Sequence, residues 1–337
     1  MKRITVVTSD NKIWNLECVY ADIVQAMSCE KPFVLDFISE APDLDLLGVY
    51  NFLAVKSHEL DFDLSKITVL TANALEQHSQ IKIVYLPPVH LLDNARDYIA
   101  DVPKHPYLKH FGIFIGRSNA QRLHLATYLD RYYQDQTIMS YHLNFIDDFH
   151  TSNIGLEDLI KNYGIQDVRD ECDFMHRCPI RIRQDAPVVI DKSLSLNPSQ
   201  QLLLNDQEYF AQTYQDFFVE IVCESFFTGR TFFPTEKIFR PILLKTPFIV
   251  QGPQNFLHNL RSLGFQTFGN WWDEGYAEDP DGQQSQEIKK LLDTLATKTP
   301  AELHTMYVDM SAVLEHNYKV AKTLTVDDFH KTFNETN

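Results

Sequence analysis

Short apolar runs alternate with longer stretches of helical periodicity over the first hundred residues. The stretches Tyr20–Met27 and Asp43–Leu53 favour helices. The apolar runs, rich in β-branched and aromatic residues, predict strands at Ile4–Thr8, Pro32–Ile38, Ile67–Leu70 and Ile81–Leu86. Strands separated by helical stretches are typical of a parallel sheet. Prolines then interrupt the pattern, and we place a linker near Pro103–Pro106.

A second block of the same kind begins at Phe111. Its apolar runs predict strands at Phe111–Gly116, Thr137–Tyr141, Phe217–Val222, Pro247–Val250 and Phe265–Phe268. Helical patterns cover Asn119–Tyr133, Leu202–Tyr214 and Ser285–His330. Residues 145–200 are polar, and we expect an irregular insertion there. The pattern predicts an α/β protein with domains over residues 1–105 and 106–310 and a helical tail over 311–337.

The composition narrows the classes of protein to which the chain can belong. It has no apolar run of about 18 residues, so we expect no transmembrane helix. The apolar N-terminal run is too short for a signal peptide, and the five cysteines are scattered as in reduced proteins. We therefore expect a cytoplasmic protein, in the host cytoplasm if the chain is viral. The net charge of −16 disfavours broad binding to nucleic acid or to an anionic membrane.

The chain is also poor in glycine, which restricts how it can bind phosphate. Neither a GxxxxGK[ST] nor a GxGxxG motif occurs among its 11 glycines. Any phosphate must therefore be bound by arginine, lysine and helix N-termini.

The first candidate site follows the strand predicted at Phe217–Val222. That strand ends in the acidic Glu224, a loop follows, and Thr235-Glu236-Lys237 opens a helix before the next strand. Thr235 is suited to cap this helix. Because ligands bind at the carboxyl edge of open parallel sheets, an anion there would meet the helix N-terminus with Lys237 beside it.

The segment Phe217–Phe268 resembles the nucleotide-binding half of GT-B glycosyltransferases, most closely the donor motif of the alpha-1,3-fucosyltransferase-like families. The resemblance implies that Glu236 holds the donor ribose and that Lys237 faces the diphosphate. Glu224 takes the position of the acid before the loop. The family's Glu-Asn-Ser is Glu224-Ser225 here and the loop is slightly longer, so the nucleotide base stays open.

A second element, Gly116–Arg122, joins a predicted strand to its helix at the same edge. In the fucosyltransferase-like families, a strand–Ser-Asn–Arg–helix element supplies an arginine to the diphosphate. On that pattern Arg122 is the first candidate and Arg117 the second, with Asn119 in the same turn. A guanidinium group makes bidentate, charge-assisted contacts with phosphate oxygens.

The resemblance further implies a fold of GT-B type: two Rossmann-like domains with a cleft between them and a terminal helix that crosses back onto the first domain. The implied reaction moves a hexosyl or pentosyl group from a nucleoside-diphosphate sugar to an acceptor hydroxyl. It needs no metal ion and no further cofactor. Two Asp-x-Asp motifs, at Asp43–Asp45 and Asp61–Asp63, do not follow strands as metal sites would, and we interpret them as surface.

An inverting transferase, the course we expect, needs a general base to deprotonate the acceptor. Glu40 and Asp36, at the end of the second predicted strand, are our candidates. Further options are His58, Glu59 and His105. A retaining transferase needs no such base, and the sequence leaves both courses open.

The acceptor that the resemblance implies is a glycan or another hydroxyl compound, or alternatively a hydroxymethylated base in DNA. Duplex binding that weakens with salt would distinguish the last. An α/β protein that binds a nucleotide without turnover is the alternative from another class. The missing glycine fingerprint disfavours an oxidoreductase.

Overall fold

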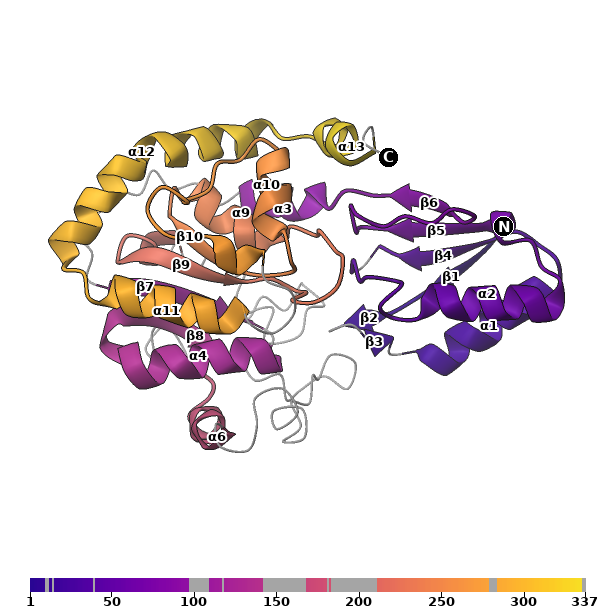
Figure 1. Cartoon of the computed structure of the whole chain (residues 1–337), viewed down its shortest axis with the longest axis horizontal. Helices are drawn as coiled ribbons and strands as arrows, with labels where there is room; N and C mark the ends of the chain where they lie inside the picture. Colours follow the sequence, from indigo (N-terminus) through magenta and orange to yellow (C-terminus); the bar gives the residue numbers. More distant parts are fainter. Residues whose placement is uncertain are drawn as a thin grey trace, which may run out of the picture.

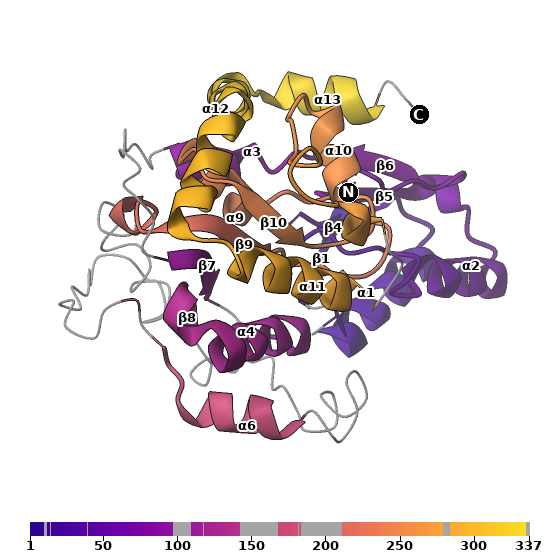
Figure 2. The ribbon, with the colours of Figure 1, turned by 60° about the vertical axis from the view of Figure 1, so that its left-hand side comes forward.

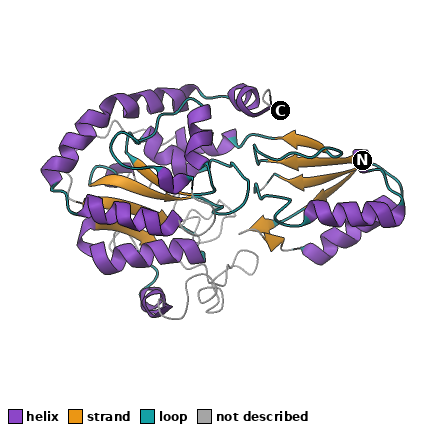
Figure 3. Cartoon of the chain, in the orientation of Figure 1, coloured by secondary structure: helices purple, strands orange, loops and turns teal. Residues whose placement is uncertain are grey.

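The structure is a computed structural model. It describes residues 1–9, 12–13, 15–38, 40–96, 109–116, 118–141, 168–180, 182, 211–278 and 284–334. These residues form two parallel sheets and their helices, which confirms the predicted α/β class (Figures 1 and 3). The predicted boundary at 105/106 lies outside the described residues. The expected irregular insertion contains a helix, α6 (Val168–His176).

The first sheet has four parallel strands in the order β1, β4, β5, β6. Their bounds are Lys2–Thr5, Phe33–Phe37, Ile67–Thr71 and Lys82–Tyr85. The inward side chains Ile4, Leu35 and Val69 share a register across β1, β4 and β5 and are buried. They lie in one apolar cluster with side chains of α1 (Leu16–Ser28) and α2 (Val49–Leu60). A short hairpin, β2 (Thr8–Ser9) with β3 (Lys12–Ile13), follows β1, and η1 (Leu64–Lys66) precedes β5.

The second sheet is doubly wound, in the order β10, β9, β7, β8. Its strands are β7 (Lys109–Ile115), β8 (Thr137–Tyr141), β9 (Phe217–Cys223) and β10 (Phe248–Gln251). The chain runs from β7 outwards to β8 and then returns to the other side of β7 to form β9 and β10. The strand order therefore reverses between β7 and β9. In open α/β sheets, ligands bind at the carboxyl ends of the strands beside such a reversal.

Helices cover both faces of this second sheet, because right-handed crossovers in opposite directions place their helices on opposite sides. On one face, α4 packs against β8 and against α11, which also contacts β10 (Figure 2). On the other face, α9 packs against β9, β10, α3 and α12. The bounds are α3 (Val89–Arg96), α4 (Ala120–Tyr133), α9 (Glu236–Leu243), α10 (Phe256–Ser262), α11 (Gln284–Ala296) and α12 (Pro300–Thr323). Short 3-10 turns, η2 (Gln134–Gln136) and η4 (Gly275–Ala277), complete this half.

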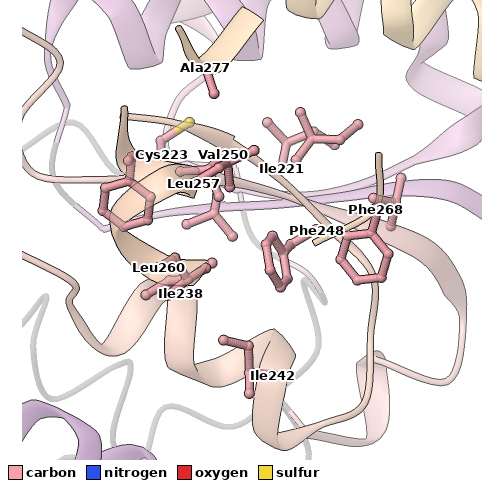
Figure 4. Close-up of a cluster of buried hydrophobic side chains, with 14 of the residues drawn as sticks. Ile221, Cys223, Ile238, Ile242, Phe248, Val250, Leu257, Leu260, Phe268 and Ala277 are labelled. Carbon is pink, nitrogen blue, oxygen red and sulfur yellow. The ribbon is translucent and has the colours of Figure 1, made fainter. Parts of the chain in front are cut away.

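The main core lies between these helices and the second sheet. Figure 4 shows Ile221, Ile238 and Phe248 meeting there from β9, α9 and β10. Gly112 in β7 makes room for an aromatic ring of β9, since a Cβ at this position would lie 2.6 Å from the Phe217 ring. Close packing of this kind leaves no room for a larger side chain at position 112 of β7.

The predicted strand at Phe265–Phe268 is wrong. Phe265 and Phe268 are buried as in a strand, but the segment has no strand partner in the described sheets. The side chain of Asn317 takes the place of a neighbouring strand. Its Oδ1 accepts from Gln266 N at 2.7 Å, and its Nδ2 donates to Gln266 O at 2.8 Å.

Two predicted helices also have different bounds in the structure. The helix expected at Asp43–Leu53 begins only at Val49, because Asp43 Oδ1 accepts the N–H groups of Asp45 and Leu46 and forms a turn. The tail predicted as one helix is divided into α11, α12 and α13 (Val326–Asn334). A capping box between Thr299 and Glu302 starts α12.

Two helices connect the halves of the chain. The helix α3 follows β6 of the first sheet but packs against α9 in the second half, and α13 returns from the second half to the first sheet. Arg96, at the end of α3, donates through Nε and Nη2 to the carbonyl of Ala321 in α12, at 3.0 and 2.8 Å. The last helix, α13, lies beside the first sheet, where His330 and Phe333 make edge contacts with the Tyr85 ring of β6 (Figure 1).

Candidate functional site

The turn after β7 and the end of β9 meet at the reversal of strand order. Asn119 caps α4, with its Oδ1 accepting from Arg122 N at 2.9 Å. The Arg122 side chain is only 4% exposed, and its Nη2 donates to the carbonyl of Glu224 at 2.5 Å. Arg122 therefore connects the first turn of α4 to the end of β9. Its contact with a diphosphate stays a prediction. Arg117 lies outside the described residues.

Glu224 closes the loop that separates β9 from α9. Its buried carboxylate accepts from Thr235 Oγ1 at 2.7 Å and from Thr235 N at 3.3 Å. Burial raises the pKa of Glu224, although the positive charge of Lys237 acts to lower it. Thr235 caps α9 as predicted, since its Oγ1 accepts from Lys237 N at 3.3 Å. Glu224 thus fixes the position of the α9 N-terminus.

Glu236 and Lys237 form the accessible part of this constellation. Lys237 Nζ lies 3.0 Å from Glu236 Oε1 and 3.2 Å from Thr235 Oγ1. The Glu236 side chain is 41% exposed. Burial by the surrounding protein acts to raise its pKa, but the Lys237 ammonium, its hydrogen bond and the backbone N–H lower the pKa to about 2. Glu236 is therefore an ionised carboxylate that solvent can reach.

The two candidate bases lie at the end of β4 in the first sheet. Asp36 is buried and pairs with Arg3, whose Nε donates to Asp36 Oδ2 at 2.7 Å. Its other oxygen accepts from Ile38 N at 3.1 Å. These contacts give Asp36 a structural role. Glu40 is partly buried, next to Ala41, whose carbonyl accepts a hydrogen bond from Thr231 of the loop before α9.

A buried asparagine connects that same loop to the first sheet, and sequence reasoning did not find it. Asn73, just after β5, accepts from Phe232 N through Oδ1 and donates to Arg230 O through Nδ2, both at 3.0 Å. Ala74 N also donates to Phe232 O at 3.2 Å. The only signal in the sequence was a polar residue after an apolar strand. We call these contacts the Asn73 clasp.

Glu76 supports the Asn73 clasp from the first sheet. Its carboxylate accepts from Tyr50 Oη at 2.7 Å, and from Leu44 N and Asn73 Nδ2 at 3.3 Å. Burial raises the pKa of Glu76 to about 7, although these hydrogen bonds act to lower it. The charge of Glu76 therefore changes near neutral pH.

Glu76→Gln is expected to remove a pH dependence of stability. Because the pKa of Glu76 is higher in the folded chain than its ordinary 4.5, the folded state binds more protons between 4.5 and about 7. The free energy of unfolding therefore falls as pH rises through this window. Urea unfolding at pH 5 and at pH 8 should show that the free energy of unfolding falls less between these pH values for Glu76→Gln than for the unaltered protein. Equal losses would contradict the prediction.

Comparisons with protein-family models, with curated proteins and with solved structures found no match. Within the described residues, no group of three or more His, Cys, Asp or Glu side chains could hold a metal ion. No helix in the same part of the chain combines the length and apolar character needed to cross a membrane.

Proposed function

We propose that this protein is a GT-B glycosyltransferase that moves a sugar from a nucleoside-diphosphate sugar to an acceptor hydroxyl without a metal ion. The observation that carries the proposal is the position of Glu236 and Lys237 at the N-terminus of α9. The residue before them, Thr235, is hydrogen-bonded to Glu224 at the end of β9, beside the reversal of strand order. An ionised carboxylate can accept hydrogen bonds from both ribose hydroxyls. The helix N-terminus and the Lys237 ammonium suit a diphosphate.

The arrangement of the two halves is consistent with a GT-B chain. Each half has a parallel sheet, and α13 returns from the second half to the first. Positive charge at the diphosphate would stabilise the nucleoside diphosphate as it leaves, so Lys237 would act mainly in the transition state. Glu40 stays the first candidate for the base, and the pairing of Asp36 with Arg3 counts against Asp36.

Lys237→Ala and Glu236→Gln are each expected to abolish binding of the donor nucleotide. A thermal-shift panel with GDP, UDP, ADP, CMP and their sugar conjugates tests this. One nucleoside diphosphate should raise the melting temperature, because a ligand at about 100 times its dissociation constant adds about 2.7 kcal/mol of stability. Lys245→Ala is the matched control, since Lys245 follows the other end of α9 and pairs with Glu315 on the surface.

Three other outcomes are informative. If none of the nucleotides shifts the melting temperature, the transferase proposal fails. A shift without sugar transfer to any acceptor would identify a nucleotide-binding protein that lacks catalysis. Salt-sensitive binding of duplex DNA with hydroxymethylated bases would identify DNA as the acceptor.

A further inference from the structure

A cavity of about 320 Å³ lies between α4, α6 and α11. None of its described lining residues is a candidate donor-binding residue. Figure 1 shows α6 and α11 on either side of α4, and α4 packs against both helices. Because a water molecule occupies about 30 Å³ in the liquid, the cavity has room for a ligand of about ten heavy atoms. This volume is at the small end of the range for ligand sites.

The ionised side chains in the described lining balance in charge. They are three cations and three acids: Arg131, Lys289, Lys290, Asp170, Glu171 and Asp293. Arg131 of α4 pairs with Asp170 of α6. Lys290 of α11 pairs with Glu287, and Asp293 Oδ1 accepts from Tyr133 Oη at 2.6 Å. Four of the six charges therefore already have partners within the protein.

His124 connects the remaining two charges. Glu171 Oε1 of α6 lies 2.8 Å from His124 Nδ1 of α4, and Lys289 Nζ of α11 lies 2.5 Å from His124 Nε2. The Tyr128 ring, whose centroid lies 4.9 Å from Lys289 Nζ, also stabilises the ammonium group. A charged ligand would lose its hydration and find the opposite charges of the described lining already paired. The lining therefore favours a neutral ligand.

Two buried oxygen atoms of the lining have no hydrogen-bond partner among the described residues. They are Glu171 Oε2 and Thr127 Oγ1, and these two residues are 2% and 4% exposed. A buried oxygen without a partner destabilises the folded chain, so each such atom needs an explanation. The carboxylate oxygen can only accept a hydrogen bond, whereas the threonine hydroxyl can donate and accept. Hydroxyl groups of a ligand can satisfy both atoms.

Two tyrosine rings give the cavity an apolar wall. The centroids of Tyr128 and Tyr132 lie 4.9 Å apart, and Tyr132 is 58% exposed. Flat apolar rings of this kind pack against C–H groups. A sugar ring has C–H groups on its faces and hydroxyl groups around its edge, and it carries no charge. We propose that this cavity binds a neutral saccharide, with a sugar ring against Tyr132 and hydroxyl groups directed to Thr127 and Glu171.

Saturation-transfer NMR tests the proposal with the methyl glycosides of glucose, galactose, mannose, fucose and N-acetylglucosamine. Adenosine and uridine serve as neutral ligands that lack this ring of hydroxyl groups around a saturated six-membered ring. At least one methyl glycoside should give signals at its C–H protons, and its titration gives a dissociation constant. The absence of signals from every glycoside would overturn the proposal, and so would tighter binding of adenosine or uridine than of any glycoside.

Thr127→Val provides the second measurement, because it removes the hydroxyl group and keeps the shape of the side chain. It should raise the dissociation constant of the sugar about tenfold. The melting temperature should not fall, since the hydroxyl group bonds no described residue. Thr305→Val is the matched control, because Thr305 is an exposed residue of α12 whose Oγ1 donates to Ala301 O at 3.0 Å. Equal affinities of the two variants would overturn the proposal.

Tyr132→Ala and Lys237→Ala locate the bound sugar. Tyr132→Ala should weaken sugar binding without unfolding the protein, because the Tyr132 side chain lies largely at the surface. If Lys237→Ala abolishes sugar binding and Tyr132→Ala does not, the sugar occupies the α9 site and the proposal fails. The inference does not rest on the proposed transferase activity, since it concerns a cavity that contains none of the candidate donor-binding residues.

Discussion

Arg240→Met is expected to lower the free energy of unfolding by about 3–5 kcal/mol, because it removes the cation from a buried ion pair. Glu220 lies on β9 with no exposed surface, and its Oε1 pairs with Arg240 Nη2 of α9. Tyr214 Oη donates to the other carboxylate oxygen at 2.6 Å and accepts from Arg240 Nε. Loss of the guanidinium leaves a carboxylate charge in the core without its cation.

Urea unfolding of Arg240→Met and of a matched surface variant measures this loss. Lys245→Met removes a pair with Glu315 in which both side chains are partly exposed, so it should cost less than about 1 kcal/mol. In the Arg240→Met background, Glu220→Gln should recover part of the stability by removing the charge. If Arg240→Met lowers the free energy of unfolding no more than Lys245→Met does, the buried ion pair contributes little to stability.

The sequence predicted those parts of the fold that depend on local pattern. The apolar runs at Phe33–Phe37 and Phe217–Cys223 are strands in the structure, because fully buried parallel strands need continuous apolar residues. The cap of α9 is equally local, because the Thr235 side chain accepts from Lys237 N, only two residues further along the chain. The segment Phe265–Phe268 carries the same apolar signal but is not a strand, because its partner is the side chain of Asn317 in α12.

The contacts of the site residues could not be predicted, because they depend on which strands become neighbours. Arg122 bonds the backbone of Glu224, which is 102 residues away, and this requires β7 to lie beside β9. Asp36 pairs with Arg3 because β4 lies beside β1. In the same way, His124 and Lys289 meet only once α4 and α11 share a face of the sheet.

Asn73→Ala is expected to destabilise the protein by about 2–4 kcal/mol and to weaken binding of the donor nucleotide. The variant leaves the buried Phe232 N–H without its acceptor, and a buried polar group left unsatisfied costs about 1–3 kcal/mol. It also removes the partly buried hydrogen bonds to Arg230 O and from Leu75 N. Glu224 holds the loop before α9 at its end, whereas the Asn73 clasp holds it in the middle. A looser loop lets Glu236 and Lys237 move, so the ligand must order them on binding.

Urea unfolding and nucleotide titration of Asn73→Ala measure the two effects together. Gln254→Ala is the control, because Gln254 is an exposed amide just after β10 whose Nε2 donates to Glu278 O at 2.9 Å. Loss of stability without loss of affinity would show that the Asn73 clasp joins the two halves but does not position the α9 N-terminus. Equal behaviour of the two variants would contradict both effects. Loss of both stability and affinity in Asn73→Ala would mean that the first sheet supports the donor site through the Asn73 clasp. Nucleotide binding at α9 would then be coupled to the arrangement of the two halves.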